Sequence, residues 1–150
     1  MIQGEFDNYN RPIVEADLQL SASGARISLR PLIDTGAVDT IIMPRDADRL
    51  GLHLGNMPPT RAIRGLGGQL RGYEFNNASM FFHDLAGTPI LFYIDVLVVT
   101  RNLLAPTQLE ALQYPSILGK GIVTRWKLTL CFLTRGNAVK EVTIDPISHD

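Results

Sequence analysis

The sequence predicts a single, mainly β domain with one or two short helices, and three observations support this. Its 150 residues are the size of one domain, and no linker, low-complexity run or internal repeat divides them. Short alternating or apolar segments recur along the chain between turns rich in glycine and proline. Helix start signals precede only short segments. We therefore expect one domain over residues 1–150, with residues 134–150 as a C-terminal hairpin extension.

Most of the chain is expected to form strands. Alternation of apolar and polar residues predicts a hairpin in which the first strand ends at Leu20 and the turn ends at Gly24. The segment from Ile90 to Val99 is apolar almost throughout, so we expect it to be buried on both faces. The predicted strands are residues 13–20, 25–32, 40–43, 73–82, 90–99, 128–133 and 139–144.

Two short helices are predicted from their end signals. Pro44 favours the first turn of a helix that ends at Leu50, because Gly51 is a typical stop. Residues 107–110, Thr-Gln-Leu-Glu, have the form of a capping box and predict a helix that continues to about Gln113.

Composition excludes several classes of protein. The chain carries 14 basic and 15 acidic residues, so nothing indicates a nucleic acid or an anionic membrane as partner. The most apolar stretch, from Pro89 to Thr100, is too short to span a bilayer, and the first residues lack the pattern of a signal peptide. Cys131 is the only cysteine, which excludes an internal disulfide, fits a cytoplasmic location and predicts a buried, unreactive thiol.

The candidate site begins at residues 32–37, Leu-Ile-Asp-Thr-Gly-Ala. Two apolar residues predict that Asp34 follows a buried strand end, while Gly36 permits a sharp turn. The hydroxyl of Thr35 is expected to bond the neighbouring backbone, which would fix the carboxylate for acid–base chemistry. The alternative is an ordinary surface turn, because a tripeptide alone is weak evidence.

A second motif makes the first more specific. Residues 116–123, Ser-Ile-Leu-Gly-Lys-Gly-Ile-Val, form another apolar strand that ends on glycine. Together, Leu-Ile-Asp-Thr-Gly-Ala and Ile-Leu-Gly resemble the retropepsin-like aspartic proteases, and the resemblance spans most of the chain. It implies a closed or barrel-like β fold, with a short helix and a strand after Gly119 like those that end retroviral proteases.

The resemblance also implies a mechanism. Pepsin-like hydrolysis needs two carboxylates around one water, yet this chain holds one Asp-Thr-Gly and no Asp-Ser-Gly. A homodimer in which Asp34 meets its own copy, Asp34′, would supply both. Two such close acids would share one proton, activate the water and cleave a peptide bond without a metal or other cofactor. Ala37, with Thr35 and Gly36, would support the site.

Residues 63–72 lie where the comparison places the flap, a mobile hairpin that closes over substrate. Their glycines suit a close backbone approach, whereas Leu70 breaks a Gly-x-Gly-x-x-Gly phosphate loop. A plain surface hairpin is the alternative. We expect the tip to be mobile without ligand. The residues expected to contact substrate are Asp39, Ile63, Gly65, Leu66, Gly67, Gly68, Ile117 and Leu118, with Asp39 alternatively a loop acid without contact to substrate.

Two departures from the viral pattern concern the dimer. Val38 and Lys120 stand where retroviral proteases usually carry a paired Asp and Arg. Because both partners of this ion pair are changed, no buried charge is left without a partner, and we expect the chain to fold. The change does affect the viral mode of dimerisation. The extra C-terminal hairpin could also occupy the pairing edge. The alternative function is therefore a binding or scaffold domain without activity, in which the two Asp34 residues never meet.

Other polar residues are weaker candidates. Asp46 and Asp48 fall in the first predicted helix, where we expect them to be solvated. His53, His83 and His149 lack metal-ligand spacing, so no metal site is expected.

Overall fold

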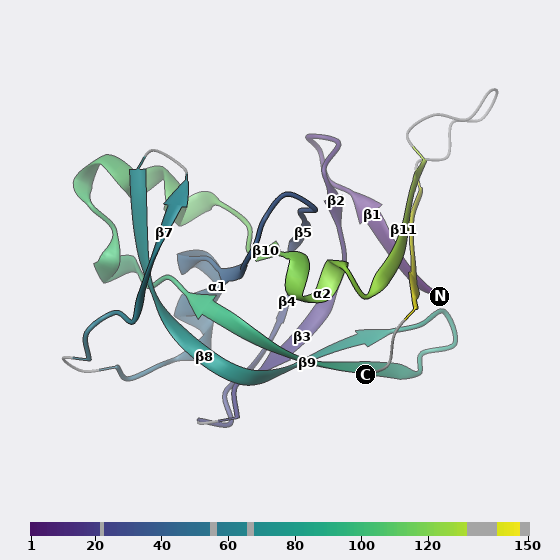
Figure 1. The fold of residues 1–150 in the computed structure, drawn as a ribbon, viewed down its shortest axis with the longest axis horizontal. Coiled ribbons are helices and arrows are strands. Elements are labelled where there is room, and N and C mark those ends of the chain that lie inside the picture. Colours follow the sequence, from purple (N-terminus) through teal and green to yellow (C-terminus); the bar gives the residue numbers. More distant parts are fainter. Residues whose placement is uncertain (22, 55–56, 66–67, 132–140, 148–150) are drawn as a thin grey trace.

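The protein is described here from a computed structural model that covers residues 1–21, 23–54, 57–65, 68–131 and 141–147. It is built mainly of strands, with helices that are all short (Figure 1). The prediction of an all-β fold with short helices is confirmed. The strands in the described residues are β1 (Ile2–Phe6), β2 (Pro12–Ile13), β3 (Ala16–Gln19), β4 (Arg26–Leu29), β5 (Leu32–Ile33), β6 (Thr40–Ile42), β7 (Arg61–Gly65), β8 (Gly68–His83), β9 (Pro89–Val98), β10 (Ile117–Leu118), β11 (Trp126–Cys131) and β12 (Glu141–Pro146).

The strands form one sheet with the hydrogen-bonded order β11-β12-β1-β2-β5-β10-β6-β9-β8-β3-β4, and β7 pairs with β8. Pairing is antiparallel except between β5 and β10 and between β6 and β9. Within the described residues the path runs from β11 to β4 without returning to its start. The long, curved β8 and β9 cross the width of the molecule and join its two ends (Figure 1).

The predicted N-terminal hairpin is present but shorter than expected. β3 and β4 pair from Ala16 opposite Leu29 to Gln19 opposite Arg26, as predicted. The ladder ends at the pair of Ala16 and Leu29, two residues before Pro31, which has no N–H to donate. Beyond it, β5 leaves this hairpin and pairs with β2 and β10 instead. The two predicted strands are therefore each divided in two.

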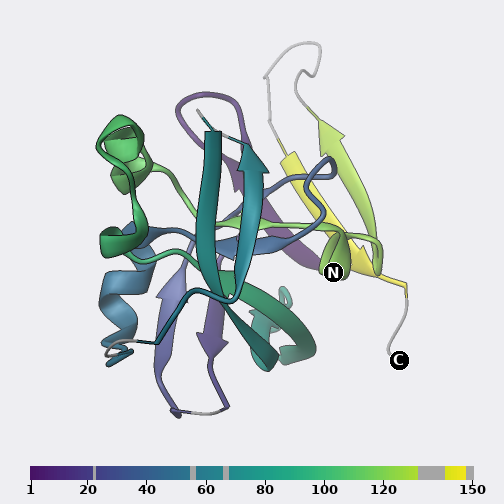
Figure 2. The ribbon, with the colours of Figure 1, turned by 60° about the vertical axis from the view of Figure 1, so that its left-hand side comes forward.

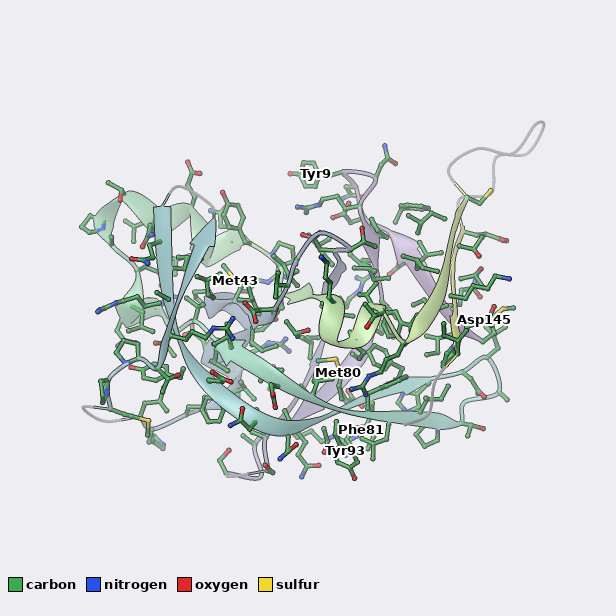
Figure 3. The ribbon with its side chains drawn as sticks, viewed as in Figure 1. Tyr9, Met43, Met80, Phe81, Tyr93 and Asp145 are labelled. Carbon is green, nitrogen blue, oxygen red and sulfur yellow. The ribbon has the colours of Figure 1, made fainter. Side chains whose placement is uncertain are left out.

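The environment of β9 differs from the prediction along half its length. Leu91 and Tyr93 are exposed, whereas Phe92 and Ile94 are buried, so this half alternates. Here β9 pairs with β8, and one face of the pair meets solvent; Tyr93 projects from that face in Figure 3. Only from Val96 to Val98, where β9 lies between β6 and β8, are consecutive side chains buried. Burial on both faces is therefore confined to the end of β9 that pairs with β6.

Three of the helices in the described residues lie where the sequence predicts them, with one difference in start, and η1 was not predicted. Helix α1 spans Pro44–Leu50, and Gly51 ends it with a left-handed φ of 61°. A 3₁₀ helix, η1, covers Arg101–Leu103, and a second, η2, covers Pro106–Gln113, so η2 starts before the predicted capping box. Helix α2 spans Lys120–Val123. Within the described residues, none of these helices has the length and apolarity needed to cross a membrane.

Two hydrophobic clusters hold the fold together. The larger contains the edge-to-face trio of Phe82, Phe92 and Trp126, with ring centroids 5.1–6.2 Å apart. Rings in this arrangement add to the stabilisation from burial alone. The smaller cluster packs between the β7–β8 hairpin and η2, and it consists of buried Ile41, Met43, Leu70, Val99 and Ala111 with Ile63, Leu104 and Tyr114 at its edge.

The C-terminal hairpin pairs inside the chain. β12 lies between β11 and the N-terminal strand β1, with Ile144 opposite both Leu128 and Ile2. Gly4 makes close packing possible here, because a Cβ at Gly4 would lie 2.9 Å from the Val142 side chain of β12. The free side of β1 is thus occupied by a strand of the same chain.

Candidate active site

The site forms where one strand is inserted between two others. β5 and β6 are consecutive along the chain, yet β10 lies between them, parallel to β5 and antiparallel to β6. The loop of residues 34–39 must therefore cross the end of β10. We call this segment the Asp34 loop; it and the β7–β8 hairpin extend toward the same side of the molecule (Figures 1 and 2).

Backbone hydrogen bonds from the end of β10 hold the Asp34 loop. The Asp34 N–H donates to the Leu118 carbonyl at 3.1 Å, and the Lys120 N–H donates to the Ala37 carbonyl at 2.9 Å. The Gly119 N–H donates to the hydroxyl of Thr40 at 3.0 Å, and this bond is buried. The loop is therefore fixed by a segment about eighty residues distant in sequence, which explains why the two motifs occur together.

The carboxylate of Asp34 ties down its own turn. Its Oδ1 accepts the Gly36 N–H at 2.9 Å, and a Cβ at Gly36 would lie only 3.3 Å from this oxygen. A side chain at position 36 would therefore crowd the carboxylate. The prediction that the Thr35 hydroxyl ties the turn is wrong, since within the described residues it has no hydrogen-bond partner. Asp34 and Thr35 are both exposed.

Asp39 connects the Asp34 loop to the β7–β8 hairpin. Its Oδ2 accepts from Nη2 of Arg61, at the start of β7, at 2.9 Å. Asp39 was expected either to contact substrate or to be a loop acid. As a loop acid, it has Arg61 as a defined partner. The pair borders a groove of about 410 Å³ with a charged lining. The other residues that line it are Val38, Thr40, Glu74, Asn77, Tyr93, Ile94, Asp95, Gly121 and Arg125.

The β7–β8 hairpin occupies the place expected for the flap. Its described ladder runs from Arg61 opposite Gly72 to Gly65 opposite Gly68. Leu66 and Gly67, both predicted to contact substrate, lie outside the described residues. Ile63 is half-buried in the smaller hydrophobic cluster, which limits how far its side chain can meet a ligand.

The two remaining predicted contacts differ in exposure. Ile117 is half-buried and pairs with Leu32 and Ile41. Leu118 is fully buried, so its side chain belongs to the core and only its carbonyl reaches the Asp34 loop. Expecting its side chain to contact substrate is therefore wrong, because this side chain packs in the larger hydrophobic cluster.

A buried polar network beneath the site was missed from the sequence. Asp46, predicted to be solvated, is only 3 % exposed, and its oxygens accept from Arg49 and from the Ser116 hydroxyl, both at 2.6 Å. The same hydroxyl oxygen accepts the Met43 N–H at 3.0 Å. The network joins α1 to the residue before β10. It thus stabilises the position of β10, whose end holds the Asp34 loop. Asp48 is exposed, as predicted, and pairs with Arg101 at 2.9 Å.

Comparison with known proteins identifies the family and the fold. Residues 18–119, more than half of the chain, match the aspartyl protease family, and the chain therefore belongs to that family. Its fold is that of the retropepsin-like members. It is similar to a retropepsin-like aspartic protease from Rickettsia conorii, with a TM-score of 0.55, 20 % identity, and coverage of 86 % of this chain and 91 % of that one. A structure of EIAV protease complexed with the inhibitor HBY-793 matches with a TM-score of 0.46, 19 % identity, and coverage of 79 % and 90 %.

Proposed function

We propose that the protein is an aspartic endopeptidase that acts as a homodimer. The observation that carries this proposal is the exposed carboxylate of Asp34, fixed at the end of β5 by the backbone of Leu118–Lys120. An exposed acid in a rigid loop is suited to meet a second copy of itself. Because each chain supplies one such acid, two chains make one site.

In the dimer, the two Asp34 carboxyl groups would share one proton, since two like charges so close cannot both ionise cheaply. The ionised group takes a proton from the bound water as its oxygen attacks the peptide carbonyl, and the protonated group donates to the carbonyl oxygen. Collapse of the tetrahedral intermediate breaks the C–N bond, and the amine leaves with a proton from the dyad. The reaction needs no metal or organic cofactor.

Pairing within the chain favours a second candidate. β12 already occupies the free side of β1, so a partner cannot add there without displacing it. In addition, Val38 is exposed where the viral pattern has an Asp. A monomeric binding domain with the same fold is the function that these two observations support if a dimer does not form.

Sedimentation and peptide cleavage, measured together, test the proposal. We expect the wild-type protein to sediment as a dimer and to cleave members of a peptide library, with activity at mildly acidic pH. Asp34→Asn should keep the fold and the dimer but lose cleavage, because an amide neither accepts the proton nor shares one. Asp48→Asn, a change in an exposed acid of α1, is the matched control and should retain activity.

Two outcomes would contradict it. Cleavage by Asp34→Asn at the wild-type rate would exclude the mechanism. A strict monomer at high concentration, without cleavage, would favour the binding domain.

A further inference from the structure

The side chain of Gln108 bridges η2 and the β7–β8 hairpin. Its Oε1 accepts the Ala105 N–H at 3.0 Å, and its Nε2 donates to the Gln69 carbonyl at 2.9 Å. Because the Ala105 N–H can only donate, the amide must turn its oxygen toward Ala105 and its NH₂ toward Gln69. At 8 % exposure, Gln108 is also one of the few buried polar side chains in the described structure. Both bonds are partly buried.

The contact falls near the far end of the hairpin. Gln69 lies opposite Arg64, one step from the pair of Gly65 and Gly68 that ends the described ladder. A Cβ at Gly68 would lie 3.7 Å from Nε2 of Gln108, so the strand runs directly past the amide. The Arg61–Asp39 pair holds the opposite end of the same hairpin. The two strands are therefore attached at both ends.

An apolar cluster lies next to this hydrogen bond along both elements. Leu70, the neighbour of Gln69, is 3 % exposed and packs in the same cluster as Ala111 of η2. Ile63 of β7 borders that cluster. A partly buried hydrogen bond beside an apolar cluster favours one arrangement of the two elements, because a shift of either element separates the polar groups from their partners.

We propose that Gln108 is a positioning residue that holds the β7–β8 hairpin against η2 and so sets the place of the hairpin relative to the Asp34 loop. The described part of the hairpin is then held by the fold itself, before any ligand binds. The consequence of this positioning for peptide cleavage rests on the proposed function, whereas the effect of Gln108 on the hairpin does not.

Amide hydrogen exchange of the whole protein tests the proposal without reference to activity. Gln108→Met has similar length and removes both hydrogen bonds; Gln108→Glu keeps an acceptor for Ala105 but, when ionised, offers no donor to Gln69. At about pH 7 we expect amides of residues 61–65 and 68–72 to exchange about fivefold faster in both variants, because both lack the one bond to Gln69 that holds the hairpin. Gln113→Met, in an exposed glutamine of the same helix, should leave exchange unchanged.

Protonation offers a rescue that a purely structural role would not show. A neutral carboxyl group can donate to the Gln69 carbonyl, so the Gln108→Glu variant should regain wild-type protection at about pH 4, compared with the wild type at the same pH. The Gln108→Met variant should not. In an active dimer, Gln108→Met should raise KM for a peptide more than it lowers kcat.

Different results would contradict the positioning role of Gln108 and the proposed peptidase function. Unchanged hairpin exchange in Gln108→Met, or equal acceleration in β11 and β12, would overturn the positioning role. Failure of the Gln108→Glu variant to regain protection at about pH 4 would also count against it. Faster hairpin exchange in a protein that cleaves no peptide would leave the positioning role intact and reject the peptidase.

Discussion

Gly119 lies directly beneath the carbonyl of Asp39: a Cβ at Gly119 would be 2.4 Å from that oxygen and 3.0 Å from the Ala37 oxygen. Both atoms belong to the backbone of the Asp34 loop, so neither can move aside alone. We expect Gly119→Ala to lift the loop and lower the free energy of unfolding by about 1–3 kcal/mol, as overpacking does. Urea unfolding measures this loss, and cleavage assays should show a larger loss of activity than stability explains.

Gly121 provides the matched control, since a Cβ there would meet nothing within 4 Å. Gly121→Ala should leave stability unchanged or raise it slightly, because alanine loses less backbone entropy on folding. Equal effects of the two substitutions would show that space under the loop is not the reason for glycine at position 119.

The parts of the site that were predicted correctly depend on short stretches of sequence. The strand before Asp34, the glycine after it and the glycine after Leu118 are visible as local patterns. Helix α1 is equally local, since Pro44 favours its start and Gly51 its left-handed end. Glycine and proline constrain the backbone wherever they occur, so such elements can be read without knowing the tertiary structure.

The parts that failed depend on pairs far apart in the chain. Asp46 looks like a surface acid on a short helix, and only the arrival of Ser116, seventy residues later, makes it a buried one. Likewise, Gln108 was read as one residue of a capping box, because nothing local indicates that Gln69 lies beside it. The role of a polar residue was therefore missed whenever its partner came from another element.

The ion pair between Arg61 and Asp39 gives a second prediction. Their side chains are 42 % and 21 % exposed, so the pair should contribute little to stability. In a double-mutant cycle of Arg61→Met and Asp39→Asn, we expect a coupling energy of about 0.2–1 kcal/mol that falls with added salt. Because the pair joins the hairpin to the Asp34 loop, Arg61→Met should reduce cleavage more than stability.

Arg71 on the neighbouring strand is exposed and serves as the control. Arg71→Met should change neither quantity. A coupling energy near zero, with cleavage unchanged, would mean that the ion pair does not hold the hairpin to the loop.

The last prediction concerns the pH dependence of stability and rests on Asp17 in β3. The hydroxyl of Ser28 donates to its Oδ1 at 2.5 Å, and this bond, with Arg26 nearby, lowers the pKa of Asp17 below its ordinary value of 3.8. A carboxyl group whose pKa is lowered by folding stabilises the folded state above the unfolded pKa, and this contribution is lost as the pH falls through the folded pKa. Ser28→Ala should therefore destabilise the protein by about 1 kcal/mol at about pH 6 and by much less at about pH 2. Urea unfolding at both values measures the difference. Ser23→Ala, which removes an acceptor for the Ala25 N–H and no partner of a carboxylate, should have the same effect at both. If the stability of the two serine variants depends on pH in the same way, the Ser28 hydroxyl is not what lowers the pKa of Asp17.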